Sequence, residues 1–181
     1  NAADFGAPQF RQRAIFIGTK YNSDFEFPKP THGENRKNPY LTVKDAIWDL
    51  IDKSTEIPNH SALNHSEKVI SRYKLIPEGG RLPPPEKLPK DIRRKNFGNT
   101  YKRLDRHTPS LTMVPGNNAF PIHPVLNRSL TPREAARIQT FPDNFIITGD
   151  RRNQCILVGN AVPPLLAKSI GKSISSILKN L

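Results

Sequence analysis

The spacing of apolar residues along the chain predicts three helices. The first covers residues 42–52, the second covers residues 66–76, and the third begins at Pro163 or Pro164. Each pattern repeats apolar positions every three or four residues, which places them on one face of a helix. Such a stripe is normally buried, so the apolar stripe of the last helix must pack against another surface, and we expect it to be exposed when the chain is isolated. This stripe consists of Leu166, Ile170, Ile174, Ile177 and Leu178.

A fourth predicted helix has the clearest start signal in the sequence. Thr131 stands at the N-cap, Pro132 at the first helical position and Glu134 at the third, which is the arrangement of a capping box. The helix should end near Gln139, because the residue before the proline of the following Phe-Pro pair disfavours helical backbone. A short helix with a firm start is therefore expected over residues 131–139.

Two short apolar runs have the length of buried strands. AIFIG occupies residues 14–18, and QCILV occupies residues 154–158, where Gly159-Asn160 follows as a tight turn. The second run, the turn and the last helix together are typical of a βα unit. Proline-rich residues 77–89 predict an extended loop. The whole pattern therefore predicts a long irregular middle followed by a βα unit at the end of the sequence.

Net charge adds a candidate partner to this picture. The chain carries 28 Lys and Arg against 16 Asp and Glu, a formal net charge of +12. Such an excess suits a polyanion such as nucleic acid or, less specifically, an acidic surface. A basic protein without such a partner is the simpler alternative, and charge alone does not separate the two.

The basic residues are densest between 93 and 106, in RRKNFGNTYKRLDR. Phe97 and Tyr101 are interleaved with them, and Gly98-Asn99 predicts a hairpin turn. The segment is either a solvated charged face or a strip whose cations meet phosphates while other side chains read base edges. The aromatic residues and the total charge favour the strip. Its basic residues are Arg93, Arg94, Lys95, Lys102, Arg103 and Arg106.

Another cluster of cations precedes the apolar run at 14–18. Gln9, Arg11 and Arg13 alternate along the chain, so an extended backbone would project all three from one edge. Two arginines at the mouth of a strand suit a carboxylate, a phosphate or a developing oxyanion. Charged residues before strands are common, so this pattern by itself is a weak indication of a site.

Other kinds of site find little support in the sequence. The five His residues lack metal-ligand spacing, and no glycine-rich nucleotide loop occurs. Cys155 is the single cysteine, which excludes an internal disulfide and a Cys-rich zinc site. Because it lies in an apolar run, we expect a buried structural thiol rather than a nucleophile. No apolar run reaches the roughly 20 residues of a membrane span, and an intracellular, reducing setting fits best.

Three stretches resemble the last three conserved blocks of the DNA (cytosine-5) methyltransferases, in the family's order: NAADFGAPQFRQRAIFIG, RSLTPREAARIQTFPDNF and QCILVGNAVPPLLAKSI. GGRLPPPEKLP and YKRLDRHTPSLTMVPGNNAFPIHP resemble the target-recognition region. The resemblance implies the C-terminal part of a Rossmann-like α/β methyltransferase with an irregular mixed α/β recognition domain. Residues 1–20 would be a fragment of the large catalytic domain, residues 21–149 the recognition domain, and residues 150–181 a strand and helix returning to the cofactor-binding domain.

The resemblance also implies roles for individual residues. Enzymes of the family flip a cytosine out of the duplex, attack its C6 with a Cys thiolate and transfer the methyl group of S-adenosylmethionine to C5. By this resemblance, Arg13 holds O2 of the flipped base and Arg11 helps to orient the pocket, while Asn160 and Ala161 contact the cofactor. No metal is implied. The DNA-contacting set would be the six basic residues of 93–106 with Tyr101, Ser110, Leu111 and Thr112.

The blocks that carry the nucleophilic Cys, the base-binding Glu and the glycine-rich cofactor loop are missing and belong upstream of Asn1. We therefore expect a C-terminal part or subunit of a DNA cytosine-5 methyltransferase, inactive alone and, when isolated, exposing the edges of an incomplete sheet. Its partners would be double-stranded DNA and an amino-terminal polypeptide or segment, and its setting the cytoplasm, in a bacterial or phage restriction-modification system. The alternative is a non-enzymatic, sequence-specific DNA-binding protein derived from the recognition domain. An RNA-binding protein has only charge in its favour.

Overall fold

The structure is a computed structural model that describes residues 1–20, 25–53, 57–94, 98–114 and 120–179. Within these residues the regular structure is helical, and extended segments meet only at isolated β-bridges. No helix of this part of the chain is long and apolar enough to cross a membrane. The α-helices and the 3-10 helices (η) are, in chain order, η1 (Ala2–Phe5), α1 (Val43–Ile47), η2 (Trp48–Leu50), α2 (Glu67–Lys74), η3 (Pro85–Lys87), η4 (Lys90–Ile92), η5 (Gly98–Tyr101), α3 (Pro132–Ile138), α4 (Arg151–Asn160) and α5 (Pro164–Leu178).

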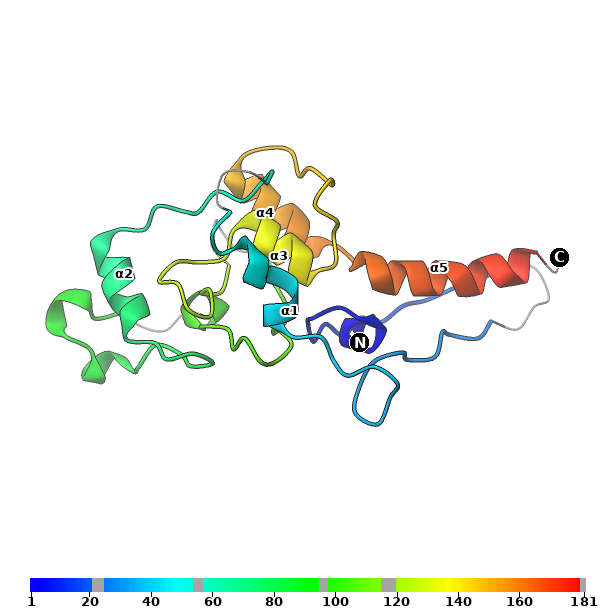
Figure 1. Ribbon diagram of the computed structural model, residues 1–181, viewed down its shortest axis with the longest axis horizontal. Coiled ribbons are helices and arrows are strands. Elements are labelled where there is room, and N and C mark those ends of the chain that lie inside the picture. Colours follow the sequence, from blue (N-terminus) through cyan, green and yellow to red (C-terminus); the bar gives the residue numbers. More distant parts are fainter. Residues whose placement is uncertain (21–24, 54–56, 95–97, 115–119, 180–181) are drawn as a thin grey trace.

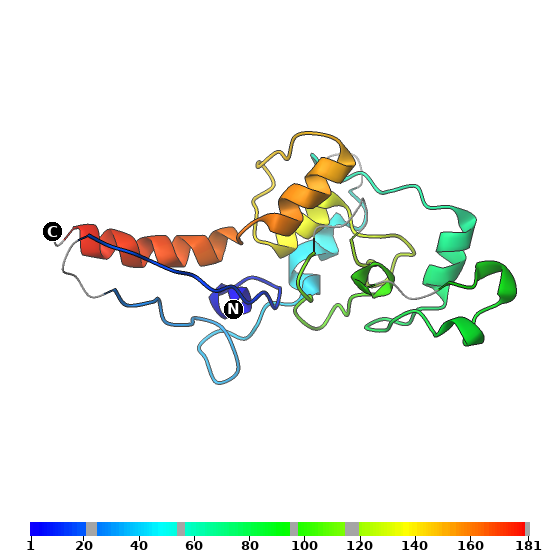
Figure 2. The same ribbon diagram turned by 180° about the vertical axis from the view of Figure 1, so that it is seen from behind.

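The molecule is elongated, with three short helices at its centre. Helices α1, α3 and α4 pack together in the middle, α2 lies towards one end, and α5 projects at the other (Figure 1). The view from behind shows the extended amino-terminal segment running beside α5 (Figure 2). The chain thus has a helical centre between a basic, loop-rich lobe and a long helical arm.

Burial follows the same division. The main core lies where α1, α3 and α4 meet, and it includes Ile47, Leu130, Ile138, Cys155 and Val158. A second core fills the lobe around Tyr73, Tyr101 and Ile122. A third, smaller core joins η1 to α5 through Ala2, Ala7 and Leu166.

The predicted helices are confirmed at 42–52, 66–76, 131–139 and from Pro164 onward. The capping box of α3 is complete: Thr131 Oγ1 accepts from the Glu134 amide at 3.1 Å, and Glu134 Oε2 accepts from the Thr131 amide at 2.7 Å. These bonds satisfy backbone donors that the first helical turn leaves without partners. The local start signal therefore specified this helix correctly.

The strand predicted at 154–158 is wrong, because these residues form the middle of helix α4 (Arg151–Asn160). Asp150 caps this helix by accepting from the Asn153 amide at 2.8 Å. Cys155 and Val158, three residues apart, then face the main core. Gly159-Asn160 is the last turn of the helix rather than a separate tight turn. A short apolar run fits a buried helix as well as a buried strand, so the strand-and-helix description of residues 150–181 is corrected to two helices.

Two further local predictions differ from the structure. Gly98-Asn99 begins the 3-10 helix η5 instead of turning a hairpin. Residues 14–18 are extended, but no strand within the described residues pairs with them, and the Phe16 side chain is 94% exposed. Ile15 packs on Leu166 and Ile170 of α5, so the stripe of the last helix is covered at its start, whereas Leu178 is exposed.

Candidate functional site

Arg11 joins three segments that are far apart in the sequence. Its side chain is 1% exposed, with Nη1 donating to the Met113 carbonyl at 3.0 Å and Nη2 donating to the Gly159 carbonyl at 2.7 Å. Its amide donates to Asn1 Oδ1 at 2.9 Å. Burial, and then the charge of Arg13, lower the pKa of Arg11, but a guanidinium keeps its proton at neutral pH. A buried cation therefore ties the predicted recognition region to the end of α4.

The backbone on either side of this contact is paired as well. Segments 8–10 and 110–112 lie parallel: the Phe10 amide donates to the Ser110 carbonyl and the Ser110 amide to the Pro8 carbonyl, both at 2.8 Å. Thr112 Oγ1 adds a bond to the Phe10 carbonyl at 2.8 Å. The stretch predicted to approach the bases is thus fixed to the stretch that carries both candidate arginines.

A hollow of about 510 Å³ opens beside this pairing. Of the predicted DNA-binding residues, Lys102, Ser110, Leu111 and Thr112 line it. Lys102 Nζ donates to the carbonyl of Gly79, another lining residue, so the ammonium is held at its wall. Ser110 is buried and contributes mainly backbone, whereas the side chains of Leu111 and Thr112 are partly exposed.

Phe10 also lines this hollow, although it is not among the site residues predicted from the sequence. Its ring is 44% exposed and meets the Tyr40 ring edge to face at 5.5 Å. In an extended segment Phe10 points away from its neighbours Gln9 and Arg11, which are buried. The signal in the sequence was its place between Gln9 and Arg11, because a segment whose polar residues alternate with an aromatic residue presents the aromatic ring on the opposite face.

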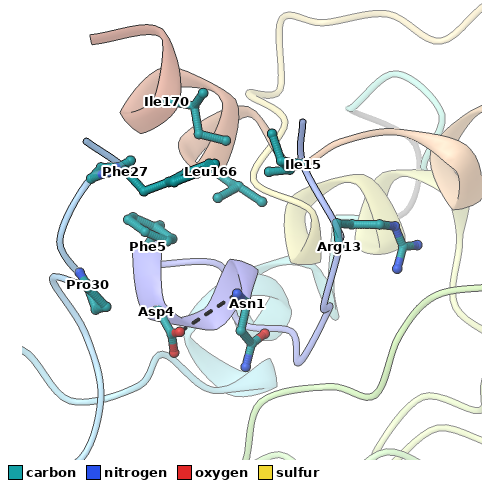
Figure 3. Close-up of a pocket in the computed structure, with 10 residues that line it drawn as sticks. Asn1, Asp4, Phe5, Arg13, Ile15, Phe27, Pro30, Leu166 and Ile170 are labelled. Atoms are coloured by element: carbon teal, nitrogen blue, oxygen red, sulfur yellow. Dashed lines mark ion pairs between the residues drawn. The ribbon is translucent and has the colours of Figure 1, made fainter. Parts of the chain in front are cut away.

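Arg13 differs from Arg11 in its exposure. It is exposed, and its Nη1 donates to the carbonyl of Gln12 at 2.6 Å. Arg13 borders a cavity of about 350 Å³ between η1 and α5, and its guanidinium points away from the apolar side chains there (Figure 3). The expectation that Gln9, Arg11 and Arg13 project together from one edge is therefore wrong, since the first two turn inward.

The basic segment divides into exposed and buried members. Arg93 and Arg94 are exposed, and the Arg94 guanidinium lies 5.6 Å from the centre of the Tyr101 ring. Lys95 lies outside the described residues. Arg106 is partly exposed, pairs with Glu78 at 2.8 Å and stacks on Trp48 at 4.8 Å.

Tyr101 and Arg103, predicted to contact DNA, are instead 3% and 4% exposed. Arg103 donates through Nε to the Ile76 carbonyl at 2.7 Å, and through Nη2 to the Tyr73 carbonyl at 2.7 Å. Its Nη1 bonds to the carbonyls of the loop at 123–126. The prediction that Arg103 contacts DNA is therefore wrong, because its N–H donors are directed to a ring of buried carbonyls and not to solvent.

A buried ionic cluster supports the same lobe. Arg128 donates to both carboxylate oxygens of Glu134, at 2.8 and 2.7 Å. Burial alone would raise the pKa of Glu134, but Arg128 and the Thr131 amide bring it below its ordinary value. His123 Nε2 lies 3.9 Å from Glu134 Oε1, while Nδ1 accepts from the amides of the two residues that follow Pro124. Burial lowers the pKa of His123 to about 4.

We expect the protein to lose stability as the pH falls from about 6.5 towards 4. Over this range the unfolded chain protonates His123 and the folded chain does not, so the free energy of unfolding falls as the pH falls, by up to about 3 kcal/mol. Urea denaturation at several pH values measures this. His123→Asn retains an acceptor at the Nδ1 position but cannot titrate, so its profile should be flatter. The remaining slope comes from His65, whose pKa burial also lowers, and, near pH 4, from carboxylates with a lowered pKa such as Glu78 and Glu134. Equal slopes for both proteins would contradict the assignment.

The predicted cofactor residues follow Gly159, the contact of Arg11 on α4. Asn160 ends the helix with its side chain exposed, and Ala161 is half-buried. Cys155 is buried, and desolvation raises the pKa of its thiol, as expected for a structural cysteine. Among the described residues no group of three or more His, Cys, Asp or Glu is placed to hold a metal ion.

Comparison with known proteins decides the family. The family model of the C-5 cytosine-specific DNA methylases matches residues 1–176. The chain belongs to this family. The family resemblance seen in the sequence blocks is thereby confirmed.

Relatives agree with this membership. Type II methyltransferase M1.HphI of Haemophilus parahaemolyticus is 39% identical over 187 residues, which cover 99% of this methylase chain and 47% of the relative. M.NgoFVII of Neisseria gonorrhoeae is 35% identical, with 99% and 49% covered. The chain thus spans about half the length of these relatives. M.AquIB of a Picosynechococcus species differs: it is 36% identical over 70% of this chain, and the match covers 93% of M.AquIB.

A solved structure has the same fold. It belongs to a protein assigned as a DNA modification methyltransferase encoded within a prophage (E. coli), and it is 26% identical to this methylase chain. The two superpose with a TM-score of 0.71, over 98% of this chain and 58% of the other. The methylase chain therefore has a DNA methyltransferase fold over the part that it spans.

Proposed function

We propose that this chain is the C-terminal part of a DNA cytosine-5 methyltransferase. It would recognise the target sequence and complete the cytosine and S-adenosylmethionine pockets of a partner that carries the nucleophilic Cys. The observation that carries the proposal is the Arg11 guanidinium, which joins the recognition segment at Met113 to the end of α4 at Gly159. Residues 1–20 and 150–181 would belong to the catalytic domain and residues 21–149 to the recognition domain.

Two candidate arginines would act differently in this proposal. Arg13, exposed beside the paired segments, would bind O2 of the flipped cytosine and balance the negative charge that grows on the ring. Arg11, with both terminal nitrogens engaged, would hold the pocket in shape without touching the base.

The cofactor side of the proposal rests on the end of α4. An exposed amide at Asn160 and a half-buried Ala161 fit a ligand with polar and apolar parts. S-adenosylmethionine, when bound, supplies the methyl group. Asn160 would hydrogen-bond this cofactor, and Ala161 would leave room for its close approach.

For the DNA surface we propose the exposed and half-exposed members of the predicted set. These are Arg93, Arg94, Lys102, Arg106, Leu111 and Thr112. Tyr101, Arg103 and Ser110 would support this surface from beneath, because they are buried. Phe10 joins the surface, since its exposed ring lines the same hollow as Thr112.

An amino-terminal polypeptide or segment would be the second partner. The match to M.AquIB supports this, because it covers 93% of that relative, whereas the matches to M1.HphI and M.NgoFVII cover about half of theirs. The exposed apolar run at 14–18 supports it as well, since Phe16 lacks any cover in the described structure.

Methyl transfer from labelled S-adenosylmethionine to mixed-sequence duplex DNA tests the proposal. The chain would be assayed alone, with its upstream polypeptide, and against that polypeptide alone. We expect activity only in the mixture. Activity of this chain alone would show that the nucleophile is not in another part. An inactive mixture, together with tight and sequence-selective DNA binding by this chain, would establish a non-enzymatic DNA-binding protein instead.

Removing two exposed arginines should weaken DNA binding without changing its sequence preference. In Arg93→Ala/Arg94→Ala we expect the slope of log K against log salt to become less negative by about 2, because each lost phosphate contact contributes about 0.9. Fluorescence anisotropy across a salt series measures the slope. Lys168→Ala/Lys172→Ala on α5 removes the same charge from exposed residues of the arm that projects away from the lobe and serves as the matched control. Equal slopes for both double variants would contradict the proposed surface.

A further inference from the structure

The stretch that joins α4 to α5 is held at both ends by the two residues that follow α3. Gln139 is the C-cap of α3, and Thr140 comes next. Gln139 contacts the last turn of α4, and Thr140 contacts the first turn of α5. The linker between them, 161–163, follows Asn160 directly and begins with Ala161, so it contains part of the proposed cofactor site.

Gln139 fixes the end of α4. Its side chain is fully buried, and Nε2 donates to the Val158 carbonyl. The same carbonyl accepts from the Ala161 amide at 3.3 Å. Carbonyls in the last turn of a helix have no partner inside the helix, so a donor from another element determines where that turn ends. Gln139 thereby sets the place at which the chain leaves α4.

Thr140 fixes the start of α5. Helix α5 begins at Pro164, and its N-cap, Pro163, makes no side-chain hydrogen bond. The Leu165 amide in the first turn donates instead to Thr140 Oγ1 at 3.1 Å. A hydroxyl from a distant element therefore does what an N-cap serine or threonine normally does. Thr140 has φ = 68°, which is unfavourable for a β-branched residue. Such a conformation persists where the surroundings enforce it, and it is concentrated at functional sites.

We propose that Gln139 and Thr140 are positioning residues for S-adenosylmethionine. They act through the linker, by holding the helix ends on either side of Asn160 and Ala161 in one geometry. Arg11 adds a third bond to the same turn at Gly159. The inference rests on the proposed function, because it assigns the linker to the cofactor. It also gives the capped helix α3 a task in addition to packing: α3 places its C-terminal pair against the linker.

Thr140→Gly separates this role from a merely structural one. Glycine adopts φ = 68° without strain, and this relief should offset much of the stability lost with the bond to the Leu165 amide and with the greater freedom of glycine in the unfolded chain, so the variant should stay folded. In the mixture of this chain with its upstream polypeptide, we expect the KM for S-adenosylmethionine to rise about fivefold, the effect of one hydrogen bond, with the KM for DNA unchanged. Thr140→Ser retains the hydroxyl and should restore the wild-type KM.

Hydrogen exchange in this chain alone gives a second readout that needs no activity. The Leu165 amide should be protected in the wild-type protein and in Thr140→Ser, and should exchange roughly tenfold faster in Thr140→Gly. Gln139→Met, which fills the space but cannot donate, should raise the same KM. Equal KM values in Thr140→Gly and Thr140→Ser would overturn the inference while the proposed function stands. An inactive wild-type mixture would overturn the proposed function and the cofactor role of the linker with it, and the exchange rates would then report only the contact.

Discussion

Arg103→Met should be the most destabilising single substitution in the lobe, lowering the free energy of unfolding by about 4 kcal/mol. The guanidinium bonds to the carbonyls of Tyr73, Ile76 and His123 and to Asn127 Oδ1. Methionine has a similar length, but it would leave these buried acceptors without donors. Urea denaturation followed by circular dichroism measures the loss.

An exposed arginine ten residues away provides the matched control. Arg93→Met removes the same charge from an exposed site and should change stability by no more than about 0.5 kcal/mol. Arg103→Lys keeps the charge but lacks the planar fork, so it should lie between the two. A loss below about 1 kcal/mol in Arg103→Met would show that the carbonyls find other partners and that Arg103 is not the centre of the lobe.

Arg11→Met should reduce methyl transfer by the mixture at least about 100-fold, with a loss of stability of about 2–3 kcal/mol. The substitution removes the bonds to the Met113 and Gly159 carbonyls, so it releases the recognition segment and the end of α4 at the same time. The expected signature is a fall in kcat together with weaker binding of both DNA and S-adenosylmethionine. Steady-state kinetics with each substrate varied in turn measure this.

Arg13 supplies the comparison for this prediction. Arg13→Met should lower kcat while leaving stability within about 0.5 kcal/mol of wild type, because its side chain is exposed. A variant of Arg11 that lost activity with unchanged affinity for both substrates would contradict its role as a link between the two sites.

Local signals predicted the parts of the fold that local interactions decide. The helix over 131–139 could be placed because the capping bonds of α3 join residues only three apart. Helix α4 has a comparable start signal in Asp150, whose side chain accepts from the Asn153 amide. The apolar run at 154–158 nevertheless fits a buried strand equally well, and a strand was predicted there. A run of five residues, four of them apolar, is too short for its periodicity to separate a helix from a strand.

The environment of the candidate residues could not be predicted in this way. Arg93 and Arg103 look alike in the sequence, yet one is exposed and the other is buried. The difference lies in backbone carbonyls at residues 73, 76 and 123, which every residue type possesses and which leave no mark in the sequence. Arg11 likewise finds its acceptors 102 and 148 residues away.

The extended run at 14–18 has a consequence for how a cell must handle this protein. An extended apolar segment without a paired strand, with Phe16 in solvent, is the kind of surface that can pair with another extended chain, including another copy of itself. While this run stays uncovered, a newly made molecule is exposed to aggregation and to proteases. We therefore expect co-expression with the proposed amino-terminal partner to give a higher yield of soluble chain than expression of this chain alone.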